Sequence, residues 1–133
     1  MTAPAGPIVA IAAIAAVEGV GLIGYAGYDL VETVRLGVGG PTDVSNVPAV
    51  TLLIVIQVLF GAGLLWVARG WWLGRRWARS PFLVAQILAV LVGYELAQSD
   101  GAAEKSVGIA AAVLAAAGIA LAFTPAASRA LDA

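Results

Sequence analysis

The chain alternates between long apolar stretches and short polar ones. Four apolar stretches stand out, at about residues 8–31, 49–68, 82–98 and 106–124. None alternates apolar and polar positions as a strand does. Each is long enough for a helix and is rich either in Ala and Gly, which are poor strand formers, or in long aliphatic side chains. A bilayer core about 30 Å thick needs about 20 helical residues. The pattern therefore predicts an all-α, polytopic membrane protein with a bundle of four transmembrane helices.

The segments between these stretches carry helix-breaking and helix-starting residues. Gly37 to Pro41 is typical of a loop, and Ser80 followed by Pro81 predicts an N-cap and first turn for the third helix. Asp100 is a candidate cap for the fourth helix, and Pro125 is expected to end it. Because the connections are short, we expect residues 1–133 to form a single transmembrane domain.

Composition excludes several classes of protein. Hydrophobic residues make up 62% of the chain and charged residues only 11%, too few to cover a soluble fold of this size. The chain has no His and no Cys, which excludes sites built on imidazole or thiolate. A net charge of −1 without a long basic block argues against nucleic-acid binding. We therefore expect no enzyme activity, no cofactor and no metal.

Basic residues predict the orientation of the chain in the membrane. Arg69, Arg75, Arg76 and Arg79 lie between the second and third helices, with no acidic residue among them. The positive-inside rule places this segment in the cytoplasm, and both termini of a four-helix chain then lie there too. The four Trp residues of the chain lie near this side. We expect a multi-pass protein of the cell membrane.

Glu18 is the most unusual polar residue within a predicted span. It lies about 15 Å from the start of the first helix, near the midplane, where an ionised carboxylate is costly. Tyr25, Asp29 and Glu32 follow on the same helical face and continue a polar stripe toward the outer surface. One interpretation is a proton or cation pathway that opens to the outside. The other is a structural hydrogen bond at Glu18 beside a solvated helix end.

Three further polar residues lie at similar predicted depth. Gln57 is about 12 Å from the outer end of the second helix, roughly level with Glu18. Tyr94 and Glu95 lie about 18–20 Å along the third helix. Gln57 is a candidate donor to Glu18, and Tyr94 is a candidate donor to Glu18 or Glu95. The alternative for Gln57 is a hydrogen bond that joins two helices, and the alternative for Glu95 is a position in the outer interface.

Small residues predict close helix packing. Gly108, Ala112, Ala116 and Ala120 recur every four residues along the fourth helix. Such stripes let helix backbones approach closely. The contact is expected either within the chain, with a second copy in a homo-oligomer, or with another membrane protein.

The segment from Arg69 to Arg79 combines arginine with tryptophan. This combination favours binding to anionic lipid headgroups of the bilayer or to a cytoplasmic partner. The alternative is that the segment serves only to orient and anchor the chain at the membrane interface.

Two sequence motifs carry a resemblance to a known group of proteins. The motifs are Gly74-Arg75-Arg76-Trp77-Ala78-Arg79-Ser80-Pro81 and Phe123-Thr124-Pro125-Ala126-Ala127-Ser128-Arg129. With them, most of the chain resembles small four-span integral membrane proteins of actinobacteria that have no assigned function. The resemblance implies the same fold and supplies no catalytic residue. A structural or accessory membrane protein is the function the sequence favours, and a small transporter or channel that uses Glu18 is the alternative.

Overall fold

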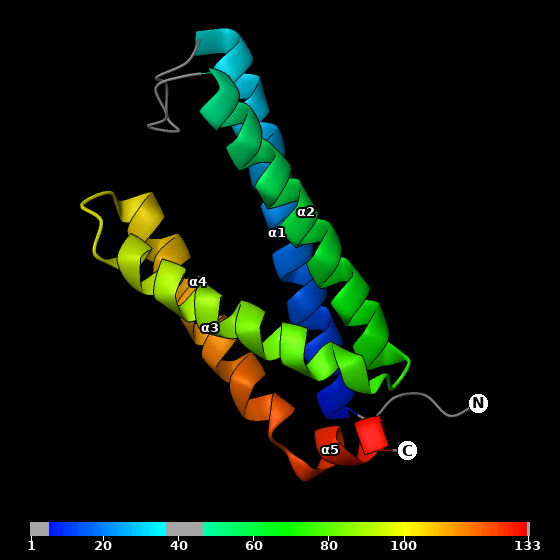
Figure 1. Cartoon of the computed structure of the whole chain (residues 1–133). Helices are drawn as coiled ribbons and strands as arrows, with labels where there is room; N and C mark the ends of the chain where they lie inside the picture. Colours follow the sequence, from blue (N-terminus) through cyan, green and yellow to red (C-terminus); the bar gives the residue numbers. More distant parts are fainter. Residues whose placement is uncertain (1–5, 37–46, 133) are drawn as a thin grey trace. The chain divides into compact units, whose positions relative to one another are not determined.

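The computed structural model describes residues 6–36 and 47–132 of the chain. Figure 1 shows its elements, which are α1 (Gly6–Leu36), α2 (Val47–Trp72), the 3-10 helix η1 (Arg76–Ala78), α3 (Arg79–Ala97), α4 (Ala102–Ala122) and α5 (Pro125–Asp132). No strand occurs in these described ranges. The all-α class predicted from the hydropathy pattern is confirmed.

Four helical segments are long and apolar enough to cross a membrane. They are Gly6–Leu36, Val47–Trp72, Arg76–Ala97 and Ala102–Ala122. Each begins before the apolar stretch that predicts it, because the ends of a helix are set by backbone geometry and not by hydropathy alone. The number of spans agrees with the prediction, and the chain has the build of a multi-pass membrane protein.

The chain divides into two compact units. Unit 1 comprises Met1–Ala15 and Val67–Ala133, and unit 2 comprises Ala16–Trp66. Helices α1 and α2 are therefore each divided between the two units.

Unit 2 is a hairpin of α1 and α2, which run in opposite directions (Figure 1). The two helices come closest at a pair of glycines. A Cβ atom added to Gly19 would lie 2.7 Å from the carbonyl oxygen of Gly61, and one added to Gly61 would lie 2.7 Å from the oxygen of Gly19. No side chain fits in that space, so this pair of glycines permits the approach of the two backbones.

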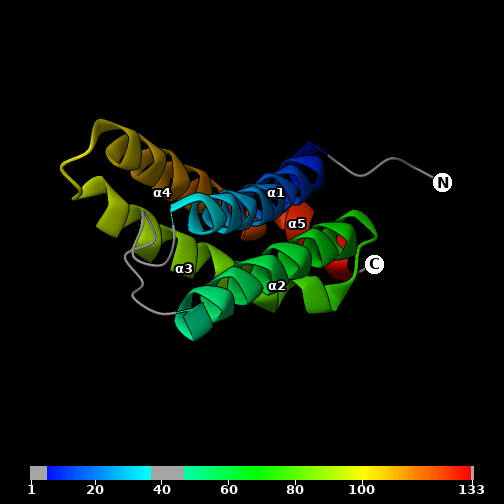
Figure 2. The same ribbon diagram turned by 90° about the horizontal axis from the view of Figure 1, so that it is seen from above.

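Unit 1 contains a second helical hairpin, formed by α3 and α4. The two helices lie side by side in both ribbon views (Figures 1 and 2). A Cβ atom on Gly93 of α3 would lie 2.7 Å from the oxygen of Gly108, and one on Gly108 would lie 2.5 Å from the nitrogen of Ala97. Toward the other end, Gly118 of α4 faces the ring of Phe82. Glycine thus sets the separation of these helices as well.

Large side chains fill the core of unit 1 near the start of α3. The side chains of Trp71 and Phe82 are fully buried, and their rings meet edge to face with centroids 5.7 Å apart. Ile8 and Ile11 of α1 are also buried. These buried apolar groups form a core of unit 1.

Helices α3 and α4 begin differently from the prediction. The residue before α3 is Ala78, whose side chain makes no cap, and Ser80 lies inside the first turn. The residue before α4 is Gly101, so Asp100 is not the cap. Pro81 is still tolerated where it lies, because backbone N–H groups of a first helical turn have no partner within the helix.

Pro125 starts a helix that the sequence analysis did not predict. Thr124 precedes α5, and its Oγ1 accepts a hydrogen bond from the backbone N–H of Ala127 at 3.3 Å. Threonine is a favoured N-cap, and proline fits the first position of a helix. Ala127 and Leu131, one turn apart, form the buried face of this short helix. The chain therefore turns at Pro125 and continues as α5.

Candidate functional site

Asp29, rather than Glu18, is the most buried residue of the polar stripe on α1. The side chain of Asp29 is only 1% exposed, whereas Glu18 is half-buried and Tyr25 is exposed. Glu32, farther along the helix, is half-buried and forms an ion pair with Arg35 at 3.1 Å. Among the described residues of unit 2, Asp29 is thus the most buried acid.

Gln57 of α2 lies in the same unit as these acids. Its position follows from the glycine pair, because Gln57 comes one helical turn before Gly61 in a helix antiparallel to α1. That turn places Gln57 level with Ile23, which is farther along α1 than Glu18. The side chain of Ile23 reaches back toward Gly61, where an added Cβ atom would meet it.

Tyr94 and Glu95 belong to unit 1. Both lie near the end of α3, and both are exposed. Their neighbour Gly93 is the residue that contacts α4. Tyr94 and Glu95 therefore extend from the sides of α3 that Gly93 does not occupy.

The arginine- and tryptophan-rich segment folds into a compact corner between α2 and α3. Gly74 makes the turn with a φ angle of +71°, a left-handed conformation that only glycine adopts easily. A Cβ atom at Gly74 would also lie 3.0 Å from the carbonyl oxygen of Ala130 in α5. On the other side of the corner, Gly70 admits Ala78 and the ring of Trp77. Two glycines therefore allow this segment to fold back on itself and on α5.

Two arginines of this corner bind the carboxyl ends of other helices. Arg76 donates a hydrogen bond from Nε to the carbonyl oxygen of Leu131 at 3.1 Å. Arg79 donates from Nη2 to the carbonyl oxygen of Ala122 at 2.8 Å. The last carbonyl groups of a helix lack partners within it and carry partial negative charge, so a guanidinium group stabilises them. These contacts hold α5 and the end of α4 against the segment.

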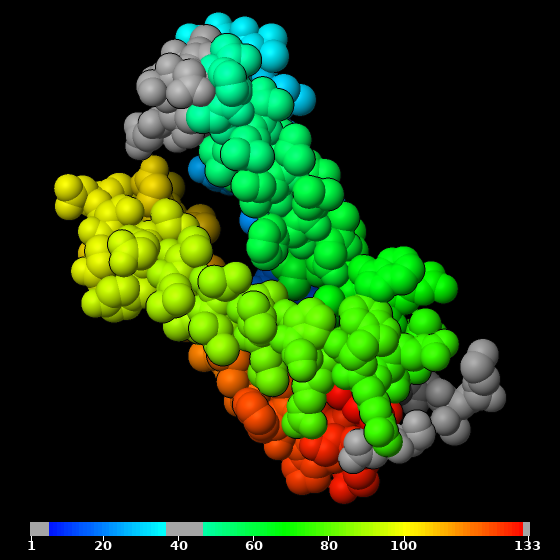
Figure 3. Space-filling view, in the orientation of Figure 1, coloured from blue at the N-terminus to red at the C-terminus, as the bar shows by residue number. Residues whose placement is uncertain are grey.

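Arg79 makes two further contacts. Its Nη2 lies 3.4 Å from the hydroxyl oxygen of Ser128, and its guanidinium carbon lies 5.6 Å from the ring centroid of Phe123, a favourable cation–π distance. Figure 3 shows the red surface of α5 directly beside the light green surface of the first turns of α3. Arg79 thus joins α3 to both sides of the turn between α4 and α5.

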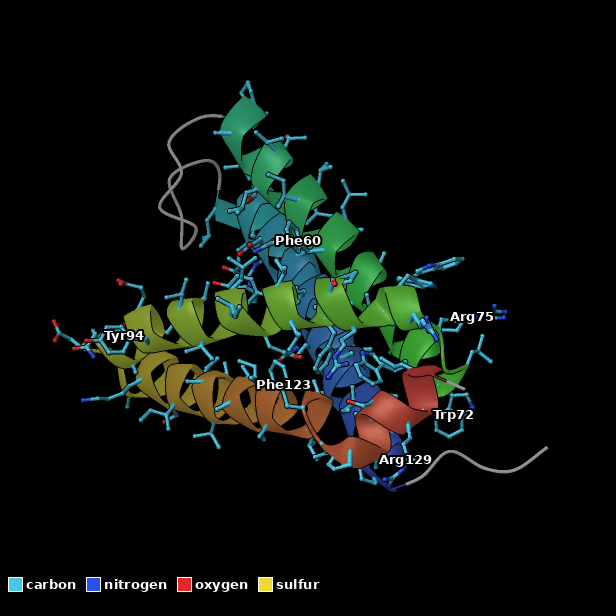
Figure 4. All side chains as sticks on the ribbon, turned by 60° about the horizontal axis from the view of Figure 1, so that its bottom comes forward. Phe60, Trp72, Arg75, Tyr94, Phe123 and Arg129 are labelled. Carbon is cyan, nitrogen blue, oxygen red and sulfur yellow. The ribbon has the colours of Figure 1, made fainter. Side chains whose placement is uncertain are left out.

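Arg69, Arg75 and Arg129 are exposed, together with Trp72 and Trp77, and Arg76 is exposed too although it binds Leu131. Figure 4 shows that Trp72, Arg75 and Arg129 lie at one end of unit 1, whereas Tyr94 lies at the opposite end of α3. We call the exposed residues Arg69, Trp72, Arg75, Trp77 and Arg129 the basic platform. Among the residues that the structure describes, no acidic side chain forms a salt bridge with its arginines.

The small-residue stripe predicted on α4 follows the packed face for only part of its length. Gly108 and Ala112 contact Gly93 of α3, but Ala116 and Ala120 are exposed. The reason is geometric, because each step of four residues turns about 40° beyond a full helical turn. The buried residues of α4 follow a spacing closer to seven, at Gly108, Ala115, Gly118 and Ala122.

The sequence analysis missed the docking of α5, although a signal was present. Thr124 and Pro125 repeat the hydroxyl–proline pattern of Ser80 and Pro81, which predicts the start of a helix. Within residues 6–36 and 47–132, no group of three His, Cys, Asp or Glu side chains is placed to hold a metal ion. Comparisons with protein-family models, curated proteins and solved structures found no match to this chain.

Proposed function

We propose that the chain is a multi-pass membrane protein with a structural or accessory role, whose basic platform binds anionic lipid headgroups at the cytoplasmic surface. The observation that carries the proposal is that two arginines bind helix ends, whereas Arg69, Arg75 and Arg129 are exposed and form no salt bridge among the described residues. Arg76 and Arg79 bind helix ends, and they fix the corner from which the other arginines project.

The apolar surface supports placement in a bilayer. Large apolar side chains are exposed on each of the four long helices, for example Val17 (61%), Leu59 (65%), Leu91 (58%) and Val113 (64%). Such extended apolar surfaces are unfavourable in water and normal against lipid. The chain thus has apolar sides along its spans and a charged platform at one end of unit 1.

Charge and aromatic rings support the choice of lipid. Tryptophan prefers the headgroup level of a membrane, and the cytoplasmic leaflet is rich in anionic lipids. Each basic residue near such a surface contributes about 1 kcal/mol. Arg69, Arg75 and Arg129 together therefore set an upper limit of about 3 kcal/mol, or about 100-fold in affinity, at low salt.

Electron spin resonance of spin-labelled lipids tests this proposal. The purified protein is reconstituted into phosphatidylcholine bilayers with either spin-labelled phosphatidylglycerol or spin-labelled phosphatidylcholine. We expect a larger protein-associated fraction for phosphatidylglycerol, decreasing as salt is raised.

The decisive variant replaces Arg69, Arg75 and Arg129 by glutamine. This triple variant should lose the preference for phosphatidylglycerol, whereas Arg35→Gln, which removes an exposed arginine from α1, should retain it. An unchanged preference in the triple variant, or equal association of both lipids with the original protein, would contradict the proposal.

Transport of a proton or small cation is a second candidate function. The observation in its favour is the burial of Asp29 on the helix that also carries Glu18. Ion flux into proteoliposomes tests it, with Glu18→Gln and Asp29→Asn as the variants. If the protein transports an ion, the original protein should give flux and at least one variant should lose it. Flux no greater than that of protein-free vesicles would contradict a transport function.

A further inference from the structure

Two buried oxygen atoms in unit 2 are not accounted for by hydrogen bonds. Among the residues that the structure describes, Asp29 Oδ2 and Gln57 Oε1 are buried without a hydrogen-bond partner. Both atoms are hydrogen-bond acceptors. Burial of an acceptor that gains no partner costs free energy, and the cost is larger for a carboxylate than for an amide. A group of positive charge would compensate both atoms.

The antiparallel pairing of α1 and α2 places Asp29 and Gln57 about 9 Å apart along the hairpin axis, on the same side of the glycine contact. From the contact between Gly19 and Gly61, Asp29 lies about 15 Å along α1, and Gln57 lies about 6 Å in the same direction along α2. Side chains on a helix lean toward its N-terminus. Because the helices are antiparallel, the side chains of Asp29 and Gln57 lean toward each other along the hairpin axis, which shortens the separation between their oxygen atoms.

The two residues also lie on the same side of the hairpin. At 100° per residue, Asp29 lies about 80° around α1 from the direction of Gly19. Gln57 lies about 40° around α2 from the direction of Gly61, and the opposite chain directions put both rotations on one side. Both acceptors therefore border the same edge of the interface between α1 and α2.

The charges around this edge favour a monovalent cation. Between Val47 and Trp66, α2 carries no titratable side chain. The titratable residues of α1 in unit 2 are Glu18, Tyr25, Tyr28, Asp29, Glu32 and Arg35. The single cation among them, Arg35, is paired with Glu32. One carboxylate with neutral oxygen ligands matches the charge of a monovalent ion, whereas divalent ions usually take more carboxylates.

We propose that Asp29 and Gln57 form a binding site for a hard monovalent metal cation such as sodium, between α1 and α2. Carboxylate and amide oxygens are the ligands that such cations prefer. The site lies in unit 2 and does not depend on lipid binding by the basic platform. It supplies a ligand class for the second candidate function, but binding alone does not require transport.

Thermal unfolding in a neutral detergent tests the site. The probe is sodium chloride, exchanged against choline chloride at constant ionic strength. We expect the melting temperature to rise with sodium and to reach saturation, because a ligand that binds only the folded state stabilises it. A melting temperature that is independent of the sodium fraction would overturn the proposal.

Variants assign the effect to the two residues. Asp29→Asn should abolish the sodium-dependent rise, and Gln57→Leu should weaken the apparent sodium affinity about tenfold or more. The matched controls are Glu104→Gln and Gln98→Leu, which replace exposed residues of unit 1, and both should respond as the original protein does. A sodium response that persists in Asp29→Asn would refute the assignment.

A direct measurement keeps the proposal testable if a variant does not fold. Broadening of the ²³Na magnetic resonance signal by the original protein should be reversed by excess lithium or potassium but not by choline. Equal reversal by choline would show an ionic-strength effect and contradict the site. The triple arginine variant should keep the sodium response, so failure of lipid binding and failure of cation binding are separable.

Discussion

Replacing Gly93 by alanine tests the glycine contact that joins α3 to α4. The added Cβ atom would lie 2.7 Å from the carbonyl oxygen of Gly108 and 2.9 Å from the backbone nitrogen of Ala112. Both neighbours are backbone atoms, so no rotation of a side chain can relieve the contact. The helices must instead move apart, which also loosens the surrounding packing.

Two opposing effects determine the change in stability. Overpacking of a tight contact costs about 1–3 kcal/mol. Alanine in place of glycine favours the helix by up to about 1 kcal/mol. For Gly93→Ala we therefore expect a net loss of about 1–2 kcal/mol in the free energy of unfolding.

The matched control is Gly63→Ala in α2, where an added Cβ atom meets nothing within 4 Å. This variant retains only the favourable effect on the helix and should be unchanged or slightly more stable. Unfolding in mixed micelles, followed by circular dichroism, gives both free energies. If Gly93→Ala were as stable as Gly63→Ala, the contact between α3 and α4 described above would be wrong.

Three further substitutions have definite expected outcomes in the same unfolding assay. Gly74→Ala should cost about 1–2 kcal/mol, because it places a side chain in a left-handed turn and against Ala130 of α5; no loss would show that the turn is relaxed. Ala112→Leu should destabilise the protein by about 1–3 kcal/mol, whereas Ala116→Leu should change it little, and equal losses would indicate that the exposed face is also packed. Gly61→Ala should separate α1 from α2 and cost about 1–2 kcal/mol, and a stability gain would contradict their close approach.

The membrane-spanning helices could be predicted because their signal is local. An apolar run of about 20 residues has few alternatives to a transmembrane helix. The exact starts could not be predicted, since Ser80 and Asp100 had the right residue types for caps but Ala78 and Gly101 occupy the positions before the helices. Cap residues are statistical preferences, and the packing of neighbouring segments decides which residue begins the helix.

The packed face of α4 shows a second limit of sequence patterns. A repeat of four small residues and a repeat of seven coincide at Gly108 and then diverge along the helix. An Ala-rich sequence supports both patterns, and only the crossing geometry with α3 selects Ala115 and Gly118 over Ala116 and Ala120. The contact partner therefore had to be known before the face could be assigned.

The candidate sites show the same dependence on tertiary contacts. The segment from Arg69 to Arg79 was recognised from its charge, but its four arginines looked equivalent. Only the contacts with α4 and α5 distinguish Arg76 and Arg79, which bind helix ends. Similarly, depth along α1 predicts Glu18 as the notable acid, whereas Asp29 is the more buried of the two in the folded chain.

Labelling of introduced cysteines from the two sides of the membrane tests the central claim most directly. The chain contains no cysteine, so Ser80→Cys at the start of α3 and Asp100→Cys after its end each provide a single reactive thiol. An impermeant maleimide added to intact cells should label Asp100→Cys and should leave Ser80→Cys unlabelled until the cells are opened. Labelling of Ser80→Cys from outside would place the basic platform on the wrong side for the lipids of the cytoplasmic leaflet. Labelling of both cysteines from one side would show that α3 does not cross the membrane.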